Sequence, residues 1–187
     1  MLSRSVSRLS ATLVALACAV CAPASAQPLD TLLHAVAERN AIAHAVAASK
    51  YPQDRPVEDV PREAQVIAAK RAAAAARGLD PDAVEQLYRQ LIAANKLVQH
   101  LDYQQFRRGA PVPPAPPLAQ LRARIDAVDA QVLDAWPALQ QLRQAPACAG
   151  TLAAAISRQG QDGIAHAALV RAMVGFCRHD GSAQAHR

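Results

Sequence analysis

Aromatic residues are scarce in this 187-residue chain, which contains one Trp, three Tyr and two Phe. They make up 3% of the sequence, so few side chains could stack on the bases of single-stranded nucleic acid. No dense run of Lys and Arg is present either, although the formal net charge is +5. We therefore predict no nucleic-acid partner.

The sequence also lacks the short motifs of several enzyme classes. It contains no phosphate-binding loop, no Ser-His-Asp set, and no His-Glu-x-x-His or Cys-x-x-Cys spacing among its six histidines and four cysteines. We therefore predict no metal site and no nucleophilic residue. Runs of β-branched residues are missing as well, and apolar residues recur every three or four positions, which predicts an all-α fold.

The first 26 residues are typical of a secretory signal peptide. Two arginines precede a short apolar run, and Ala-Ser-Ala at positions 24–26 supplies the small residues of a cleavage site. The apolar run is too short to span a membrane comfortably, so we predict cleavage before Gln27. The mature protein would then act in the periplasm or outside the cell, free of the membrane. A retained N-terminal anchor, or a lipoprotein formed at Cys18 or Cys21, is the alternative.

Residues 27–187 are expected to form a single all-α domain of about six helices, because this length suits one core but not comfortably two. Three long helices are predicted within residues 27–108, where prolines and a glycine mark the breaks. The Pro-rich segment 109–117 cannot be helical and is predicted to be an extended linker. Residues 118–187 would then form a C-terminal helical extension that folds back over the first three helices.

Two cysteines, Cys148 and Cys177, remain after loss of the signal segment. An even pair in an exported chain is most simply a disulfide, and a metal site is the weaker alternative. Loss of that segment also reduces the 20 Lys and Arg to 18, against 15 Asp and Glu, so the mature protein is mildly basic.

Several charged or polar side chains fall on helix faces that ought to be buried. Arg39 and Lys50 are 11 positions apart, three helical turns plus about 20°, so they share a face with Ile42 and Val46. The same conflict recurs on the next three predicted helices, at Arg62 and Glu63, at Asn95 and Gln99, and at Arg122.

Each of these residues alone has a simple structural interpretation. A single Arg or Lys at the border of an apolar stripe extends its charged head to water, Asn or Gln fixes helix register, and Asp59 caps the second helix. We expect Arg89, Lys96 and Arg124 to lie on solvated faces and the histidines to be incidental. Trp136 is expected in the core.

Together, however, three arginines, a lysine and a glutamine directed into one helical core would be strongly destabilising unless they met an anion. An Arg side chain matches a carboxylate with two parallel hydrogen bonds, so the expected ligand is a compact dianion that carries carboxylates. Glu63 would suit a hydroxyl on the same ligand.

The spacing of these residues resembles the AroQ-type chorismate mutases, and more closely their secreted, gamma-type members. Arg39 and Lys50 match the family's Arg-x10-Lys pattern, and residues 57–63 match its Val-x-Asp-x-x-Arg-Glu pattern. Asn95 and Gln99 match its polar pair four residues apart, although relatives usually carry Ser or Thr at the first of these positions.

The segment after the linker adds to the resemblance. "LRARIDAVDAQVL" looks like the opening of the first helix of the short intracellular enzymes, where an arginine reaches into the partner's site. In the secreted type an arginine of the C-terminal extension takes that place within the same chain, and Arg122 stands there. Cys148 and Cys177 match the disulfide positions of that extension.

The resemblance implies a cofactor-free rearrangement of chorismate to prephenate, in which one C–O bond breaks as one C–C bond forms. It implies that Arg39, Arg62 and Arg122 hold the two carboxylates of the substrate. It also implies that Lys50 and Gln99 donate hydrogen bonds to the ether oxygen and that Glu63 accepts one from the ring hydroxyl. The backbone around Asp59 would assist Glu63, and Asn95 would contact the substrate.

Two other functions remain open. An isochorismate pyruvate lyase has the same helical fold, and a non-catalytic exported module that binds an anion or a protein partner would share the charged helix faces. The long C-terminal extension favours the mutase, and a homodimer is compatible with the resemblance. The length leaves no room for a fused dehydratase or dehydrogenase, so we predict a single activity.

Overall fold

The structure, a computed structural model, describes residues 26–161 and 163–178, and these residues form helices and loops without a strand. Residues 1–25 of the predicted signal segment and residues 179–187 lie outside them. The predicted all-α fold is confirmed, with seven α-helices in the described residues where about six were expected. They are α1 (Ala26–Lys50), α2 (Val60–Ala76), α3 (Pro81–Arg107), α4 (Leu118–Ala135), α5 (Gln140–Gln144), α6 (Cys148–Arg158) and α7 (Gly163–Ala172), with 3-10 turns at Tyr51–Gln53 and Pro137–Leu139.

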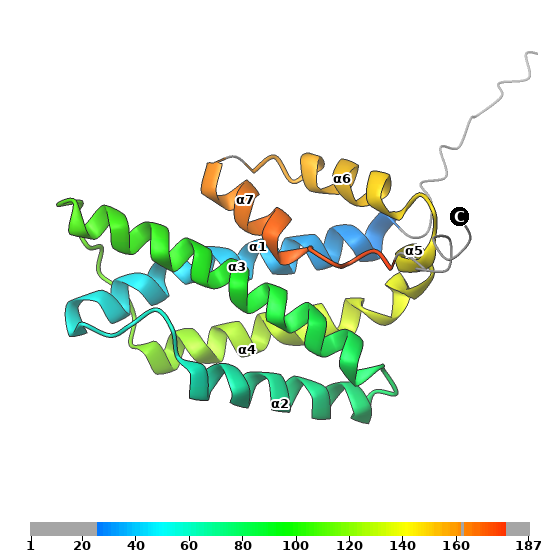
Figure 1. The fold of residues 1–187 in the computed structure, drawn as a ribbon, viewed down its shortest axis with the longest axis horizontal. Coiled ribbons are helices and arrows are strands. Elements are labelled where there is room, and N and C mark those ends of the chain that lie inside the picture. The colour runs from blue at the N-terminus through cyan, green and yellow to red at the C-terminus, as the bar shows by residue number, and fades with distance from the viewer. Residues whose placement is uncertain (1–25, 162, 179–187) are drawn as a thin grey trace, which may run out of the picture.

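The long helices pack into one bundle around α1 and α3 (Figure 1). α1 contacts α4 and α3, and α3 also contacts α2 and α7. In Figure 1, α2 lies along the lower side of the bundle, and α6 and α7 lie along its upper side. Aliphatic side chains of the central helices, such as Leu32, Leu91 and Leu121, are fully buried between them. Within the described ranges, none of the helices has both the length and the apolar character needed to cross a membrane.

Short-range hydrogen bonds mark the starts of α2 and α3. Asp59 Oδ1 accepts from the backbone N–H of Arg62 at 3.3 Å, and Asp80 Oδ1 accepts from the backbone N–H of Asp82 at 3.0 Å. Such caps satisfy N–H groups that have no partner within their helix. Gly78 follows α2 with a φ of +66°, a left-handed conformation that glycine adopts without strain. Asp59, expected to cap the second helix, does so.

The chain reverses after α3, so that its C-terminal half packs onto its N-terminal half. Residues 109–117 contain no helix, and they carry the chain to α4, which lies against α1. Pro137 begins the 3-10 turn that follows α4, and Trp136 is 1% exposed, in the core as expected. Side chains from both halves therefore meet in one interior.

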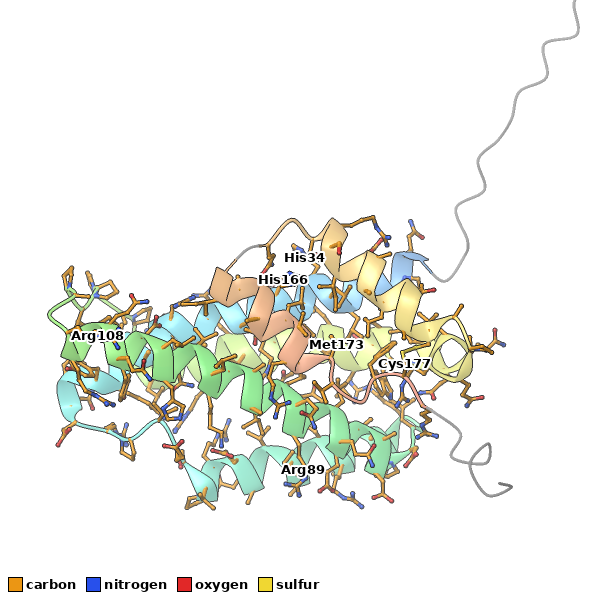
Figure 2. The ribbon with its side chains drawn as sticks, turned by 45° about the horizontal axis from the view of Figure 1, so that its top comes forward. His34, Arg89, Arg108, His166, Met173 and Cys177 are labelled. Atoms are coloured by element: carbon orange, nitrogen blue, oxygen red, sulfur yellow. A yellow bond between two sulfur atoms is a disulfide. The ribbon has the colours of Figure 1, made fainter. Side chains whose placement is uncertain are left out.

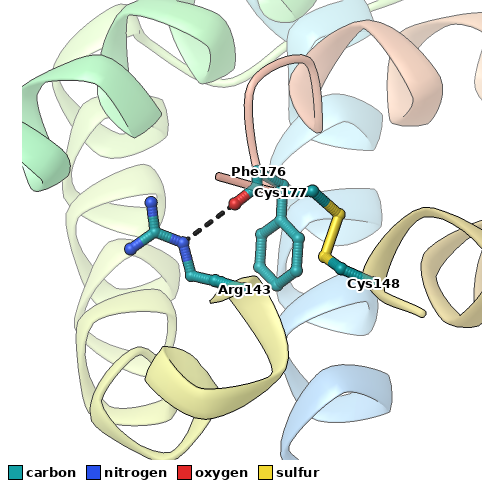
Figure 3. The surroundings of a disulfide bond; sticks show 4 residues. All are labelled: Arg143, Cys148, Phe176 and Cys177. Atoms are coloured by element: carbon teal, nitrogen blue, oxygen red, sulfur yellow. Dashed lines mark hydrogen bonds between the residues drawn. A yellow bond between two sulfur atoms is a disulfide. The ribbon is translucent and has the colours of Figure 1, made fainter. Parts of the chain in front are cut away.

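The predicted disulfide joins Cys148, at the start of α6, to Cys177, with 5.8 Å between the Cα atoms. Figure 3 shows Arg143 beside this bond, where its Nε donates to the carbonyl oxygen of Phe176 at 2.9 Å. The Arg143 guanidinium also lies 4.1 Å from the centre of the Trp136 ring, and burial lowers its pKa to about 10. The bond and the arginine together hold the segment after α7 against α5 and the start of α6.

Two of the cations that were expected on solvated faces are exposed in the structure. Arg89 of α3, labelled in Figure 2, has a side chain that is 62% exposed and pairs with Glu85. Arg124 on α4 is exposed as well. These two residues lie on solvated faces as expected, whereas Lys96 does not.

Candidate active site

Four helices line one cavity, and every predicted site residue lies on its wall. They come from α1, the loop before α2, α2 itself, α3 and α4, so the predicted faces converge on one place. In chain order they are Arg39, Lys50, Asp59, Arg62, Glu63, Asn95, Gln99 and Arg122. Apolar side chains complete the wall: Val46, Val57, Val66, Ile92, Leu118 and Ile125.

The wall of this cavity carries five cations and three carboxylates, an excess of two positive charges. A ligand with two negative charges would balance that excess, and opposite charges attract more strongly in a partly enclosed cavity than in bulk water. The cations are Arg39, Lys50, Arg62, Lys96 and Arg122, and the carboxylates are those of Asp59, Glu63 and Asp126.

Arg39 is 4% exposed, and two contacts hold its guanidinium. Nε donates to Asp129 Oδ1 at 2.9 Å, and Nη1 donates to the carbonyl oxygen of Leu91 at 3.0 Å. A guanidinium has five N–H donors in a fixed plane, so the remaining Nη protons are left for a ligand in the cavity.

Lys50 lies at the end of α1 and is 6% exposed. Its Nζ donates to the carbonyl oxygens of Pro56 at 3.1 Å and Val57 at 2.8 Å. An ammonium group has three donors, so one is left for a ligand. Burial lowers the pKa of Lys50 below the usual 10.5, while the charge of Asp59 acts in the opposite direction.

Asp59 connects α2 to α4 and also lies close to Glu63. Its Oδ2 accepts from Arg122 Nη2 at 2.9 Å, and its backbone N–H points to Glu63 Oε1 at 3.4 Å. Glu63 Oε2 in turn accepts from Lys96 Nζ at 3.0 Å. The expectation that Lys96 lies on a solvated face is therefore wrong: α2 packs against α3, and Glu63 faces the lysine across that contact.

Asn95 and Gln99 form a buried amide pair on α3. Gln99 Nε2 donates to Asn95 Oδ1 at 2.7 Å, and Asn95 Nδ2 donates to the carbonyl oxygen of Arg39 at 3.2 Å. Gln99 Oε1 is buried without a hydrogen-bond partner. Asn95 thus uses its amide to connect α3 to α1 and to hold Gln99.

Arg62 and two residues behind the wall complete the charged network. Arg62 Nη2 lies 3.8 Å from Asp126 Oδ2, a loose and partly exposed pair. Asp129 on α4 is fully buried, and the Nζ of Lys70 on α2 lies 2.9 Å from its Oδ2. Neither residue was predicted from the sequence to belong to the site. The sequence does contain a signal for Asp129, because this carboxylate follows Ile125 by four positions and therefore lies on the apolar face of its helix.

Comparison with known proteins identifies the family. The family model described as chorismate mutase type II matches residues 30–100. The secreted chorismate mutase of Mycolicibacterium smegmatis is 33% identical over 159 residues, which cover 82% of this chain and 88% of that protein. The chain belongs to the chorismate mutase family. The secreted chorismate mutase of Mycobacterium tuberculosis is 30% identical over 156 residues, which cover 80% of this chain and 78% of that protein.

Solved structures of chorismate mutases share the fold. The crystal structure of chorismate mutase from Burkholderia thailandensis is 30% identical, with a TM-score of 0.77 over 81% of this chain and 99% of that chain. The enzyme from Burkholderia phymatum has the same identity and TM-score, over 84% of this chain and 100% of that chain. The likeness to chorismate mutases therefore extends over most of the described residues.

Proposed function

We propose that the protein is an exported chorismate mutase, which rearranges chorismate to prephenate. The observation that carries this proposal is the excess of two positive charges on the cavity wall, because chorismate carries two carboxylates. The reaction is intramolecular, since one C–O bond breaks while one C–C bond forms in the same molecule. The site therefore has to hold the reactive conformer and stabilise developing charge, and it needs no nucleophile.

Arg39, Arg62 and Arg122 bind the two carboxylates in this proposal. Arg39 is preorganised, because Asp129 and a backbone carbonyl already fix its plane. Arg62 and Arg122 have partly exposed carboxylate partners, which the substrate can replace. Fixing both carboxylates at once favours the compact conformer in which the two carbons that bond lie close together.

Lys50 and Gln99 stabilise the ether oxygen, which gains negative charge as its C–O bond breaks. The third N–H of the Lys50 ammonium is free of the carbonyl contacts that fix the other two. Gln99 Nε2 has a second N–H besides the one that it donates to Asn95. Two such donors aimed at one oxygen would stabilise the transition state more than the substrate.

Glu63 accepts the ring hydroxyl of the substrate. Lys96 holds Glu63 Oε2 at 3.0 Å, whereas Oε1 has only the 3.4 Å contact with the backbone N–H of Asp59. The Oε1 lone pairs are therefore the available acceptors. Asn95 takes part in binding indirectly: its Oδ1 accepts from Gln99 Nε2, and its Nδ2 donates to the backbone carbonyl oxygen of Arg39.

The export of the enzyme is proposed from the composition of residues 1–26, and two relatives are named as secreted. Removal of this segment would leave residues 27–187 as a single domain in the periplasm or outside the cell. A homodimer is also proposed. The site itself needs only one chain, because all eight predicted site residues line the same cavity within it.

The test is to incubate the purified mature protein separately with chorismate and with isochorismate, and to identify the products. Prephenate from chorismate supports the mutase. Salicylate and pyruvate from isochorismate, without prephenate from chorismate, would show the lyase. Turnover of neither compound would favour the anion-binding or partner-binding module.

A matched pair of variants tests whether the cavity performs the reaction. Lys50→Ala removes a buried cation of the cavity and should lower kcat/KM by about 100-fold or more. Arg89→Ala removes a largely exposed cation of α3 that does not line the cavity, and it should leave kcat/KM unchanged. Equal losses in both variants would contradict the assignment of the cavity.

A further inference from the structure

A fully buried carboxylate lies directly behind the cavity, where it pairs with a residue of the wall. Asp129 is 0% exposed on α4, and its Oδ1 accepts from Arg39 Nε at 2.9 Å. Its backbone carbonyl oxygen also accepts from the Tyr88 hydroxyl at 3.0 Å, which fixes this turn of α4 against α3. A buried carboxylate is costly unless cations compensate it, so its position calls for an explanation.

Asp129 sets the orientation of the Arg39 guanidinium. With Nε bound to Asp129 and Nη1 bound to the Leu91 carbonyl oxygen, two donors of the planar group point away from the cavity. The plane is then fixed, and the remaining Nη protons face a ligand that enters the cavity. Without the contact to Asp129, a single hydrogen bond to Leu91 would leave the group free to rotate about that bond.

The same contact has an electrostatic cost. A carboxylate 2.9 Å from Arg39 cancels much of its positive charge and would repel a dianion in the cavity. Lys70 offsets this cost, because its Nζ lies 2.9 Å from Asp129 Oδ2, the oxygen that Arg39 Nε does not contact. The same Nζ lies 3.9 Å from Asp126 Oδ1, a longer contact with a carboxylate that is half exposed. The contact between Lys70 and Asp129 is an ion pair without the alignment of a hydrogen bond, so Lys70 acts mainly through its charge.

We infer that Asp129 positions Arg39 for a carboxylate of the substrate, and that Lys70 neutralises Asp129 so that Arg39 keeps its positive charge for the substrate. Asp129 and Lys70 are positioning residues, since neither lines the cavity. Their charges cancel, which preserves the excess of two positive charges on the wall. This inference rests on the proposed function.

A purely structural role of Asp129 and Lys70 predicts different results. If the three charges only stabilised the contact between α1, α2 and α4, each substitution would lower the free energy of unfolding and leave KM for chorismate unchanged. If Lys70 acts by neutralising Asp129, removing Lys70 should raise KM, and removing the charge of Asp129 in the same protein should restore it. Recovery of KM without an equal recovery of the melting temperature would distinguish an electrostatic effect on the substrate from a purely structural coupling of the pair.

The experiment measures kcat, KM and the melting temperature of the oxidised mature enzyme with Lys70→Met, Asp129→Asn and both substitutions. Lys70→Met should raise KM by about tenfold with a smaller change in kcat, because the lost attraction acts on substrate and transition state alike. The double variant should recover most of this loss, since the Asn side chain can still accept from Arg39 Nε. Lys70→Arg keeps the charge and should keep KM close to that of the wild type.

Arg77→Met is the matched control, because Arg77 lies just after α2 and its exposed side chain contacts only exposed Asp134, at 3.8 Å, and the carbonyl oxygen of Ala73 on its own helix, at 3.3 Å. It should leave KM unchanged, which separates the local pair from the general field of the protein. If Lys70→Met is too unstable to assay, Lys70→Gln makes the same change of charge.

The outcomes are distinguishable. Any of three results would overturn the inference: an unchanged KM in Lys70→Met, no recovery of KM in the double variant, or an equal rise of KM in Arg77→Met. The proposed function would stand in each case, provided that the wild-type protein turns over chorismate. Absence of wild-type turnover of chorismate would overturn both.

Discussion

Arg122 and Asp59 are 63 residues apart in the chain, yet Arg122 Nη2 lies 2.9 Å from Asp59 Oδ2 and joins α4 to the start of α2. The other oxygen of Asp59 accepts from the backbone N–H of Arg62. One carboxylate therefore caps a helix and holds a cation of the cavity in the same chain. Because both side chains are more than a third exposed, a carboxylate of the substrate can compete for Arg122.

Arg122 should act only within its own chain. Arg122 and Arg39 line the same cavity of one chain, so mixing Arg122→Ala and Arg39→Ala proteins should restore no activity, even after unfolding and refolding together. The measurement is the turnover of chorismate by the refolded mixture compared with each variant alone. Recovery toward one intact site per mixed dimer would show that the site is shared between chains.

Gln99→Glu should shift activity toward acid. An amide N–H donates at every working pH, whereas a carboxyl group donates only when protonated, and an unperturbed Glu has lost most of its proton by about pH 5. Loss of a well-aimed donor costs about 3–4 kcal/mol of transition-state stabilisation, so kcat/KM at neutral pH should fall by hundreds-fold. The measurement is the ratio of kcat/KM between variant and wild type from acid to mildly alkaline pH.

The matched control for this prediction is Gln99→Met, which lacks a donor at every pH. Its ratio to the wild type should be low and flat, whereas the ratio for Gln99→Glu should rise as the pH falls. A flat ratio near one for Gln99→Glu would mean that Gln99 does not touch the breaking bond.

Lys50 should set the alkaline limit of kcat/KM. Only its ammonium form donates, and burial lowers its pKa below 10.5, so kcat/KM should fall as the pH rises through that lowered pKa. The bound dianion favours the ammonium, so kcat should fall at a higher pH than kcat/KM does. Lys50→Arg, which stays charged, should be slower but show neither decrease. A wild-type kcat/KM that stays level up to pH 10.5 would disprove the assignment.

Cys148 and Cys177 should contribute to stability and not to chemistry. The bond lies outside the cavity wall and closes a loop with a sequence separation of 29. In the chain-entropy account, such a loop stabilises the fold by about 3–4 kcal/mol, which corresponds to about 10 °C in melting temperature. Replacement of both residues by Ser should lower the melting temperature by that amount and leave turnover at low temperature nearly intact. A large loss of turnover in a folded variant would argue for a second role.

The fold could be predicted because its signals are local. The capping Asp80, the left-handed Gly78 and the helix-breaking Pro137 each act within a few residues, and they mark helix ends where the structure has them. Most of the eight predicted site residues could be selected from the sequence, because a polar or charged residue on an apolar stripe, such as Arg39, conflicts with its own helix. That conflict shows that a partner must exist. Asp59 was the exception, since its place in the site came from the family resemblance.

The partners themselves could not be found in this way. Lys96 has no conflict with its helix, and only the packing of α2 against α3 places Glu63 opposite to it. The same holds for Lys70, whose role depends on Asp129 of a helix that comes 59 positions later. Pairing across helices is decided by tertiary packing, which periodicity within one helix does not report.

The linker of residues 109–117 is a point at which the chain could be cut into two parts of the same site. Most of its residues are exposed, seven of the eight predicted site residues come before it, and Arg122 comes after it. The Cys148–Cys177 bond lies wholly on its C-terminal side and cannot tie the two parts together. A single cut in the linker would therefore yield two fragments that share one cavity and are joined by noncovalent contacts alone: the packing of α4, α6 and α7 on α1 and α3, and ion pairs such as Arg122–Asp59. Catalysis would then depend on fragment concentration, and the protein would behave as a split enzyme whose turnover reports the association of its halves.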